Sequence, residues 1–252
     1  MSSDIWTQCA GPSDIRTLRL TAWRVVESQH QISTRKLVDS LEEQALLEEL
    51  IDRAKPPNLA SPRQHYLLTT PFRYPPLRHG SRFGSRQDRG IWYGATTVAT
   101  AMAEVAYYRL VFLEGTTADL GQVSVELTAF RVHARTTRGV DLVVEPFAAH
   151  RRLIASPSHY YATQALGAAM RADGLELCRY PSARDPQGGV NVAVFSPTVF
   201  GRSAPQGFQS WRCAASRHTV EITRRDLAAK DALVFERHLF LVNHRLPTPA
   251  ID

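Results

Sequence analysis

Apolar residues recur along this chain with two different spacings, which predict a mixture of strands and helices. Apolar or alternating runs predict strands at 21–26, 91–95, 122–132, 139–147, 175–180 and 190–195, with weaker candidates at 208–213, 219–223 and 238–242. Helical spacing predicts three helices, at 34–55, 97–112 and 160–172. Because strands and helices do not alternate regularly, the pattern predicts the α+β class.

Residues that favour helix ends stand at the borders of the three helices. Ser33, Thr96 or Thr97, and Ser158 carry side chains that can cap a first turn. Gly174 is placed to end the third helix. The first helix is amphipathic, with leucines on one face and glutamates on the others. Such a helix packs on its own core or against a partner, and we favour core packing.

Residues 56–90 lack apolar periodicity and predict a long irregular segment. The segment holds six prolines and six arginines but a single acidic residue, Asp88. Long loops inside compact domains are usually functional or disordered. Tyr66, Phe72 and Phe83 are among several apolar anchors that argue against disorder. The segment is therefore a candidate functional loop.

The bulk composition is that of a folded protein. The 252-residue chain is long enough to bury a core, and no apolar run reaches the length of a membrane-spanning helix. The first residues include acids and no apolar stretch of signal-peptide length, so we expect a cytoplasmic protein. Cys9, Cys178 and Cys213 are scattered and odd in number, which predicts free thiols.

The charge balance favours an anionic partner without identifying it. The net charge is +6, and arginine supplies 27 of the 30 basic residues. Arginine presents a rigid fork that matches phosphate. A nucleic acid, an anionic nucleotide and an acidic protein all fit such a surface.

Several common catalytic motifs are absent. The sequence has no GxGxxG, no GxxxxGK[ST], no HExxH and no GxSxG, and its nine histidines lack metal-ligand spacing. We therefore expect no metal, no Rossmann-type cofactor site and no P-loop, and an enzyme would need a different constellation.

One such constellation lies between Gly80 and Arg109. Arg82 stands in a glycine-flanked loop, Tyr93 follows 11 positions later on a predicted strand, and Glu104 follows after another 11 on a predicted helix. Because an adjacent strand and helix pack together, Tyr93 and Glu104 can face one cleft.

These residues resemble the signature of the RES family, which is named for its Arg, Glu and Ser. The resemblance is carried by SRFG, IWYGA and TAMAEVA in order, and by Pro181-Ser182-Ala183, which matches the family's serine. Arg24, within AWRVV, takes the position of the family's first arginine. The match covers 22–26 and then 80 to about 200. The chain departs from compact members by an insertion between Arg24 and Arg82 and by its C-terminal tail.

The resemblance implies an ADP-ribosyltransferase-like α+β fold, with a central mixed or antiparallel sheet flanked by helices. It implies a single RES-type domain over residues 1–252, with an N-terminal strand and inserted helix at about 20–60 and a core from about 62 to 245. It also implies a toxin that destroys NAD+ by cleaving the nicotinamide–ribose bond, through phosphorolysis or hydrolysis. No cofactor is then required, although inorganic phosphate is a candidate co-substrate.

The same resemblance implies a cognate antitoxin of the Xre-like type, with no membrane partner and no direct nucleic-acid partner. The sequence leaves open whether the protein forms a homodimer. Two alternatives from other classes also stay open: a mono-ADP-ribosyltransferase that modifies a macromolecule, and a basic nucleic-acid-binding protein. The latter rests on the positive charge, although no known binding motif accompanies it.

Each site residue receives a role from the implied chemistry. The Glu104 carboxylate would stabilise a ribosyl oxocarbenium ion. Arg82 and Arg24 would bind the pyrophosphate or an incoming phosphate. Tyr93 would stack on nicotinamide or orient the ribose, and Ser182 would donate to the ribose or to a phosphate.

Arg73 and Phe83 are second candidates for substrate binding. Both belong to the proline-rich segment that precedes the predicted strand at 91–95. A cation and an aromatic ring beside Arg82 could form a wall of the adenine or phosphate site. A purely structural loop is an equal alternative.

Overall fold

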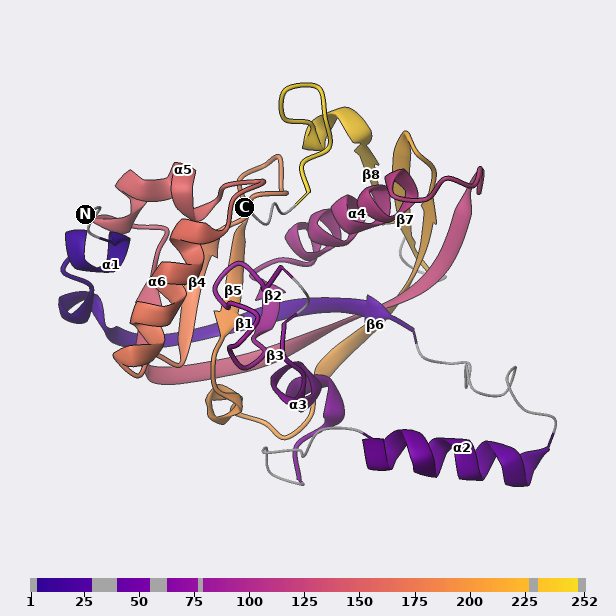
Figure 1. Ribbon diagram of the computed structural model, residues 1–252, viewed down its shortest axis with the longest axis horizontal. Helices are drawn as coiled ribbons and strands as arrows, with labels where there is room; N and C mark the ends of the chain where they lie inside the picture. The colour runs from indigo at the N-terminus through magenta and orange to yellow at the C-terminus, as the bar shows by residue number, and fades with distance from the viewer. Residues whose placement is uncertain (1–3, 29–39, 55–62, 77–78, 227–230, 249–252) are drawn as a thin grey trace.

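The backbone is organised around two long antiparallel strands, β1 (Arg16–Glu27) and β3 (Val123–Asp141). The computed structural model describes residues 4–28, 40–54, 63–76, 79–226 and 231–248. Figure 1 shows the two strands running side by side through the body of the protein. They pair from Arg16 opposite Gly139 to Glu27 opposite Leu127. This ribbon carries the rest of the sheet.

Three short strands join β1 to the far end of β3 and close a ring. The order is β1, β2 (Trp92–Ala95), β5 (Val190–Val194), β4 (Leu177–Pro181) and β3, and β3 pairs back with β1. The β3–β4 pair is parallel and the other pairs are antiparallel. Three further strands extend the sheet from β3: β6 (Gln206–Ala215), β7 (Thr219–Arg224) and β8 (Ala232–Glu236). The fold is thus α+β with a mixed sheet, as predicted.

The two faces of the ring strands bury different cores. All five strands contribute to the inner core, which includes Ala22, Trp92, Phe130, Leu177 and Val192. Helix α3 (Tyr66–Arg73) packs against this core through Leu67, Leu68 and Phe72. On the outer face, one core lies under α1 (Ile5–Gln8), α5 (Arg151–Ile154) and α6 (Tyr161–Ala172), and another under α4 (Val98–Glu114).

Helix α4 begins and ends close to where the sequence predicts. Thr97 is its N-cap and accepts a hydrogen bond from the Thr100 amide. Its buried residues include Ala103, Ala106, Tyr107 and Leu110, at the three- and four-residue spacing of one helix face. This face packs against β6 and β7, which fixes the helix across the sheet.

The strand predictions hold for the ring but fail at two places. The predicted strand at 139–147 is wrong as a separate element, because β3 continues unbroken to Asp141 with β1 and then β4 as partners. The predicted strand at 238–242 is wrong, because Arg237–Phe240 forms a 3₁₀ helix and β8 precedes it. Short 3₁₀ helices also occur at Gly11–Asp14, Phe147–His150 and Pro197–Val199.

The structure corrects two of the helix predictions and leaves a third untested. The segment 56–90 is not wholly irregular, because α3 forms there with His65 as its N-cap. The cap at the start of α6 is Tyr160 rather than Ser158. The predicted start of the first helix at Ser33 lies outside the described residues, and α2 covers Leu41–Ala54. The sequence also gave no signal for α1 or α5.

Helix α2 stands apart from the rest of the protein in Figure 1. Leu46, Leu50 and Ile51 are all more than 40% exposed, so the prediction that this helix packs on the core is wrong for these side chains. The three cysteines are free, as predicted, and all three are buried. Among the described residues, no helix is long and apolar enough to cross a bilayer.

Gly167 allows the loop before β2 to approach α6. A Cβ added at this glycine would lie 2.0 Å from the Phe83 carbonyl oxygen, which no real contact permits. We expect Gly167→Ala to lower the free energy of unfolding by about 1–3 kcal/mol, as overpacking does, even though alanine favours helix over glycine. Chemical denaturation would measure the change.

Gly115→Ala is the matched control for this substitution. Gly115 caps α4 with φ −74°, and its added Cβ would meet only ordinary contacts, the nearest at 3.4 Å. Its stability should therefore stay close to that of the unmodified chain. Equal stability of the two variants would contradict the close approach at Gly167.

Candidate functional site

The centre of the candidate site is the carboxylate of Glu104, which α4 presents to the β4–β5 connection. Its Oε1 accepts a hydrogen bond from the Ser182 hydroxyl at 2.7 Å and another from the Asn191 amide at 2.6 Å. No described residue donates to Oε2. The structure therefore brings together Glu104 and Ser182, which lie far apart in the sequence.

Asn191 is a member of this site that the sequence analysis missed. It lies in β5 opposite Tyr180 of β4 and Ala95 of β2, on the outer face of the ring. It is 3% exposed, and its Oδ1 has no partner among the described residues. The available signal was a lone amide in the otherwise apolar strand VNVAV, where a buried polar group needs a partner.

The turn that carries Ser182 is built to hold the hydroxyl in place. The Ser182 Oγ accepts from the backbone amides of Arg184 and Asp185, each at 3.1 Å, so its own hydrogen is left to donate to Glu104. The Ser182 amide donates to the Gly189 carbonyl at 2.8 Å, which closes the turn. Three further bonds thus fix the serine that contacts the carboxylate.

The serine turn is also tied to the start of α4. The Thr100 hydroxyl donates to Asp185 Oδ2 at 2.8 Å, one helical turn before Glu104. An added Cβ at Gly189 would lie 2.2 Å from both the Thr100 Oγ1 and Asp185 Oδ2 atoms. Only glycine therefore allows the turn and the helix to meet at this distance.

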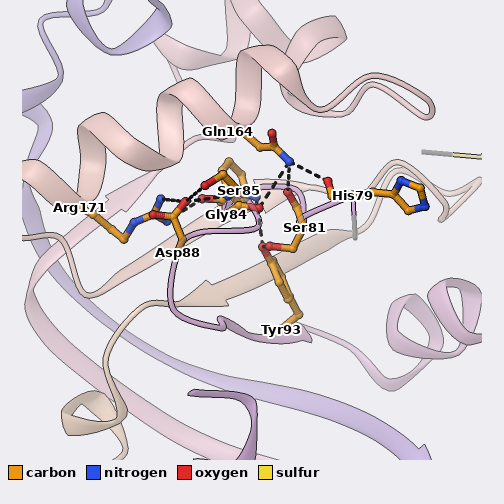
Figure 2. Close-up of polar contacts among 9 residues, drawn as sticks. His79, Ser81, Gly84, Ser85, Asp88, Tyr93, Gln164 and Arg171 are labelled. Atoms are coloured by element: carbon orange, nitrogen blue, oxygen red, sulfur yellow. Dashed lines mark hydrogen bonds and ion pairs between the residues drawn. The ribbon is translucent and has the colours of Figure 1, made fainter. Parts of the chain in front are cut away.

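Tyr93 supports the neighbouring loop, as Figure 2 shows. Its hydroxyl donates to Ser81 Oγ at 2.9 Å and accepts from the Phe83 amide at 3.1 Å. Burial raises the pKa of Tyr93 well above its ordinary value, so the phenol stays protonated. These contacts make Tyr93 a residue that positions the loop around Arg82.

Two side chains of α6 complete the attachment of this loop (Figure 2). Gln164 donates to the carbonyl oxygens of His79 and Ser81, each at 3.1 Å. Arg171 donates to the Phe83 carbonyl at 2.6 Å and pairs with Asp88 at 2.7 Å. Within the predicted functional segment 56–90, residues 79–88 are therefore held in place by hydrogen bonds and an ion pair from α6.

Arg82 is buried beside the site rather than projecting into solvent. It is 8% exposed, and its NH1 donates to the carbonyl oxygens of Ile154 and Ser156 at 2.9 and 3.0 Å. Its guanidinium lies 4.8 Å from the centre of the Tyr160 ring. The described residues give it no acidic partner.

Arg184, two residues after Ser182, is a second buried arginine that the sequence analysis did not single out. It is 4% exposed and donates through NH2 to the Pro157 carbonyl. Its guanidinium lies 3.5 Å from the centre of the Tyr107 ring. Burial raises the pKa of Tyr107 to about 12, while the positive charge of Arg184 acts in the opposite direction.

Three predicted residues form no hydrogen bond or ion pair with Glu104 in the described part of the chain. Arg24 points into the ring, where it lies over Trp92 and donates to the Tyr93 carbonyl at 3.3 Å, and burial lowers its pKa to about 10. Phe83 is fully buried and packs edge-on against Tyr180. Arg73 ends α3, the helix that packs against the inner core.

Comparison with protein families identifies the chain. Residues 55–216, more than half of its length, match the RES domain, and the chain belongs to the RES domain family. The matched segment contains Arg82, Tyr93, Glu104 and Ser182, whereas Arg24 precedes it. A search of curated proteins finds no match.

Family membership gives the chain a toxin–antitoxin-associated, NAD-related function at the level of the family. RES domains are generally associated with enzymatic toxins that act on NAD, and their occurrence in such systems points to an antitoxin partner. The described residues contain no cluster of side chains suited to a metal ion.

The contact between Asn191 and Glu104 can be tested without any assay of activity. Asn191→Asp would place a second carboxylate within about 3 Å of the first, and two carboxylates this close share one proton. In the folded variant, one carboxyl group of the pair then has a pKa above its unfolded value. The variant is therefore most stable at low pH, where the pair holds its proton, and its free energy of unfolding falls as the pH rises through that pKa. At pH 7 we expect a loss of about 1–3 kcal/mol beyond that of Asn191→Ala.

Denaturation at a series of pH values would measure this difference. Asn191→Ala serves as the control, because it removes the hydrogen bond at every pH and adds no charge. A difference between the two variants that does not change from pH 3 to pH 8 would contradict the close contact of residues 191 and 104.

Proposed function

We propose that this protein cleaves the bond between nicotinamide and ribose in NAD+. The observation that carries the proposal is that the Glu104 carboxylate accepts hydrogen bonds through only one of its two oxygens in the described structure. Ser182 and Asn191 both donate to Oε1, so they fix the orientation of the group while Oε2 is left for a substrate. Membership of a family of NAD-acting toxins supplies the substrate class.

The chemistry suits a fixed carboxylate. When the glycosidic bond breaks, its electron pair goes to nicotinamide, which leaves as a neutral base from a cationic ring and needs no proton. The ribose becomes an oxocarbenium ion, and a negative charge that is already oriented stabilises it as it forms. Glu104 is the catalytic residue in this proposal, while Ser182 and Asn191 are positioning residues.

An acceptor oxygen then bonds to the ribose carbon. Inorganic phosphate would give nicotinamide and ADP-ribose phosphate, and water would give ADP-ribose and release a proton. Arg184 is linked to Glu104 through Ser182, and Arg82 donates to the carbonyl adjacent to the one that Arg184 uses. The two buried arginines provide a positive field that suits a phosphate-bearing substrate. The activity would deplete an essential cofactor, which fits a toxin controlled by an antitoxin.

Glu104→Gln tests the role of the carboxylate. The amide oxygen of glutamine can still accept from Ser182 and Asn191, so the fold should be kept while the negative charge is lost. We expect the rate of NAD+ loss to fall by at least about a hundredfold, as for other preorganised electrostatic groups. Absorbance or fluorescence assays of NAD+ would measure the rate.

Glu114→Gln on the same helix is the matched control. Glu114 forms a surface ion pair with Arg237, and such pairs contribute little to stability. Its NAD+ cleavage should match that of the unmodified chain. A folded Glu104→Gln variant that retains full activity would refute the assigned role.

Product analysis distinguishes the acceptors. Purified protein is incubated with labelled NAD+, with and without phosphate, and the small molecules are separated by chromatography. Phosphorolysis gives a phosphate-dependent product, whereas hydrolysis gives ADP-ribose under both conditions. Label transferred to a protein or nucleic acid instead would replace this proposal with a macromolecular ADP-ribosyltransferase.

A further inference from the structure

The two buried arginines beside the site share one anchor segment. Arg82 donates to the Ser156 carbonyl, and Arg184 donates to the carbonyl of the next residue, Pro157. Because consecutive Cα atoms are only about 3.8 Å apart, this segment draws the two guanidinium groups to one place. The Arg184 amide donates to the Ser182 hydroxyl that contacts Glu104, and the Arg184 guanidinium lies over Tyr107, three residues after Glu104 on α4. These contacts place the pair on the side of α4 that carries the carboxylate.

Both guanidinium groups are held by neutral partners rather than by acids. Each uses one terminal nitrogen for backbone carbonyls, and each faces an aromatic ring, Tyr160 for Arg82 and Tyr107 for Arg184. No described residue accepts from the Nε or the other terminal nitrogen of either arginine. Each guanidinium therefore keeps two nitrogens available for another acceptor.

The nearby carboxylates do not neutralise these charges. Glu104 directs Oε1 to Ser182 and Asn191, and Asp185, the residue after Arg184, accepts from Thr100. Neither acid forms an ion pair with Arg82 or Arg184 in the described structure. Two positive charges, each more than nine-tenths buried, thus have no counter-ion among the residues that the structure describes. Buried charges are ordinarily paired, so this arrangement calls for an anion.

We infer that Arg82 and Arg184 form a paired-arginine subsite for a phosphate group. Two guanidinium forks fixed in orientation match the several oxygens of a tetrahedral phosphate better than a point charge does. Arg184 is the new member of this subsite. The proposed function suggests two sources for the phosphate, the pyrophosphate of the dinucleotide and free inorganic phosphate. The inference rests on the proposed function for the choice of these two sources only.

Calorimetric binding tests the subsite without turnover. The full chain is titrated with inorganic phosphate and, separately, with ADP-ribose, with adenosine as a ligand that lacks phosphate. Arg184→Gln should weaken binding of at least one phosphate ligand by about ten- to a hundredfold, the loss expected for a charged hydrogen bond. Arg184→Lys keeps the positive charge but not the guanidinium fork, so its affinity for the phosphate ligand should lie between those of Arg184→Gln and the unmodified chain.

Arg152→Gln is the matched control, because Arg152 is an exposed arginine on the nearby α5. It should bind every ligand as the unmodified chain does. Melting temperatures would show whether each variant is folded. If Arg184→Gln does not fold, Arg184→Lys still tests the subsite.

The two ligands identify the source of the phosphate. Weaker binding of ADP-ribose alone assigns the subsite to the dinucleotide, and weaker binding of inorganic phosphate alone assigns it to a free phosphate. The inference is overturned if neither ligand binds the unmodified chain, or if the folded Arg184 variants bind both ligands as tightly as the control does. Because binding is measured without turnover, failure of the Glu104→Gln activity test would leave this result standing.

Discussion

The candidate site depends on one oxygen atom that accepts two hydrogen bonds from two different parts of the β4–β5 hairpin. Ser182 leaves the end of β4 and Asn191 belongs to β5, yet both donate to Oε1 of Glu104. A carboxylate held by two donors cannot rotate without losing both. The arrangement therefore couples the position of α4 to the hairpin, and it leaves Oε2 as the oxygen that accepts from no described residue.

This coupling explains why the surroundings of the site are so strongly cross-linked. Thr100 ties the first turn of α4 to Asp185, and Gly189 permits the contact by having no side chain. On the other side, Gln164 and Arg171 of α6 hold the loop that carries Arg82. Each link joins segments that are distant in sequence, so the site is preorganised by tertiary contacts rather than by any one element.

Arginine serves two distinct purposes in this protein. Several arginines form ion pairs at the surface, among them Arg53, Arg224 and Arg237. Arg82 and Arg184 differ, because they are buried, bind backbone carbonyls and lie over tyrosine rings. The excess of arginine over lysine noted in the sequence thus has a structural use where a flat, multi-donor cation must fit between a ring and a carbonyl.

The sequence by itself determined the elements with strong local signals and the family to which the chain belongs. The apolar spacing of α4, its Thr97 cap and the short apolar runs of β2, β4 and β5 were predictable, and the spaced Arg, Glu and Ser residues pointed to the RES family. Only the tertiary structure decided that Asn191 contacts Glu104, that Arg24 faces the inside of the ring, and that Arg82 and Arg184 donate to adjacent carbonyls. Those outcomes depend on strand register and on contacts between residues far apart in the chain. Local spacing cannot encode them, because a shift of one residue in register would turn every side chain of a strand to the other face.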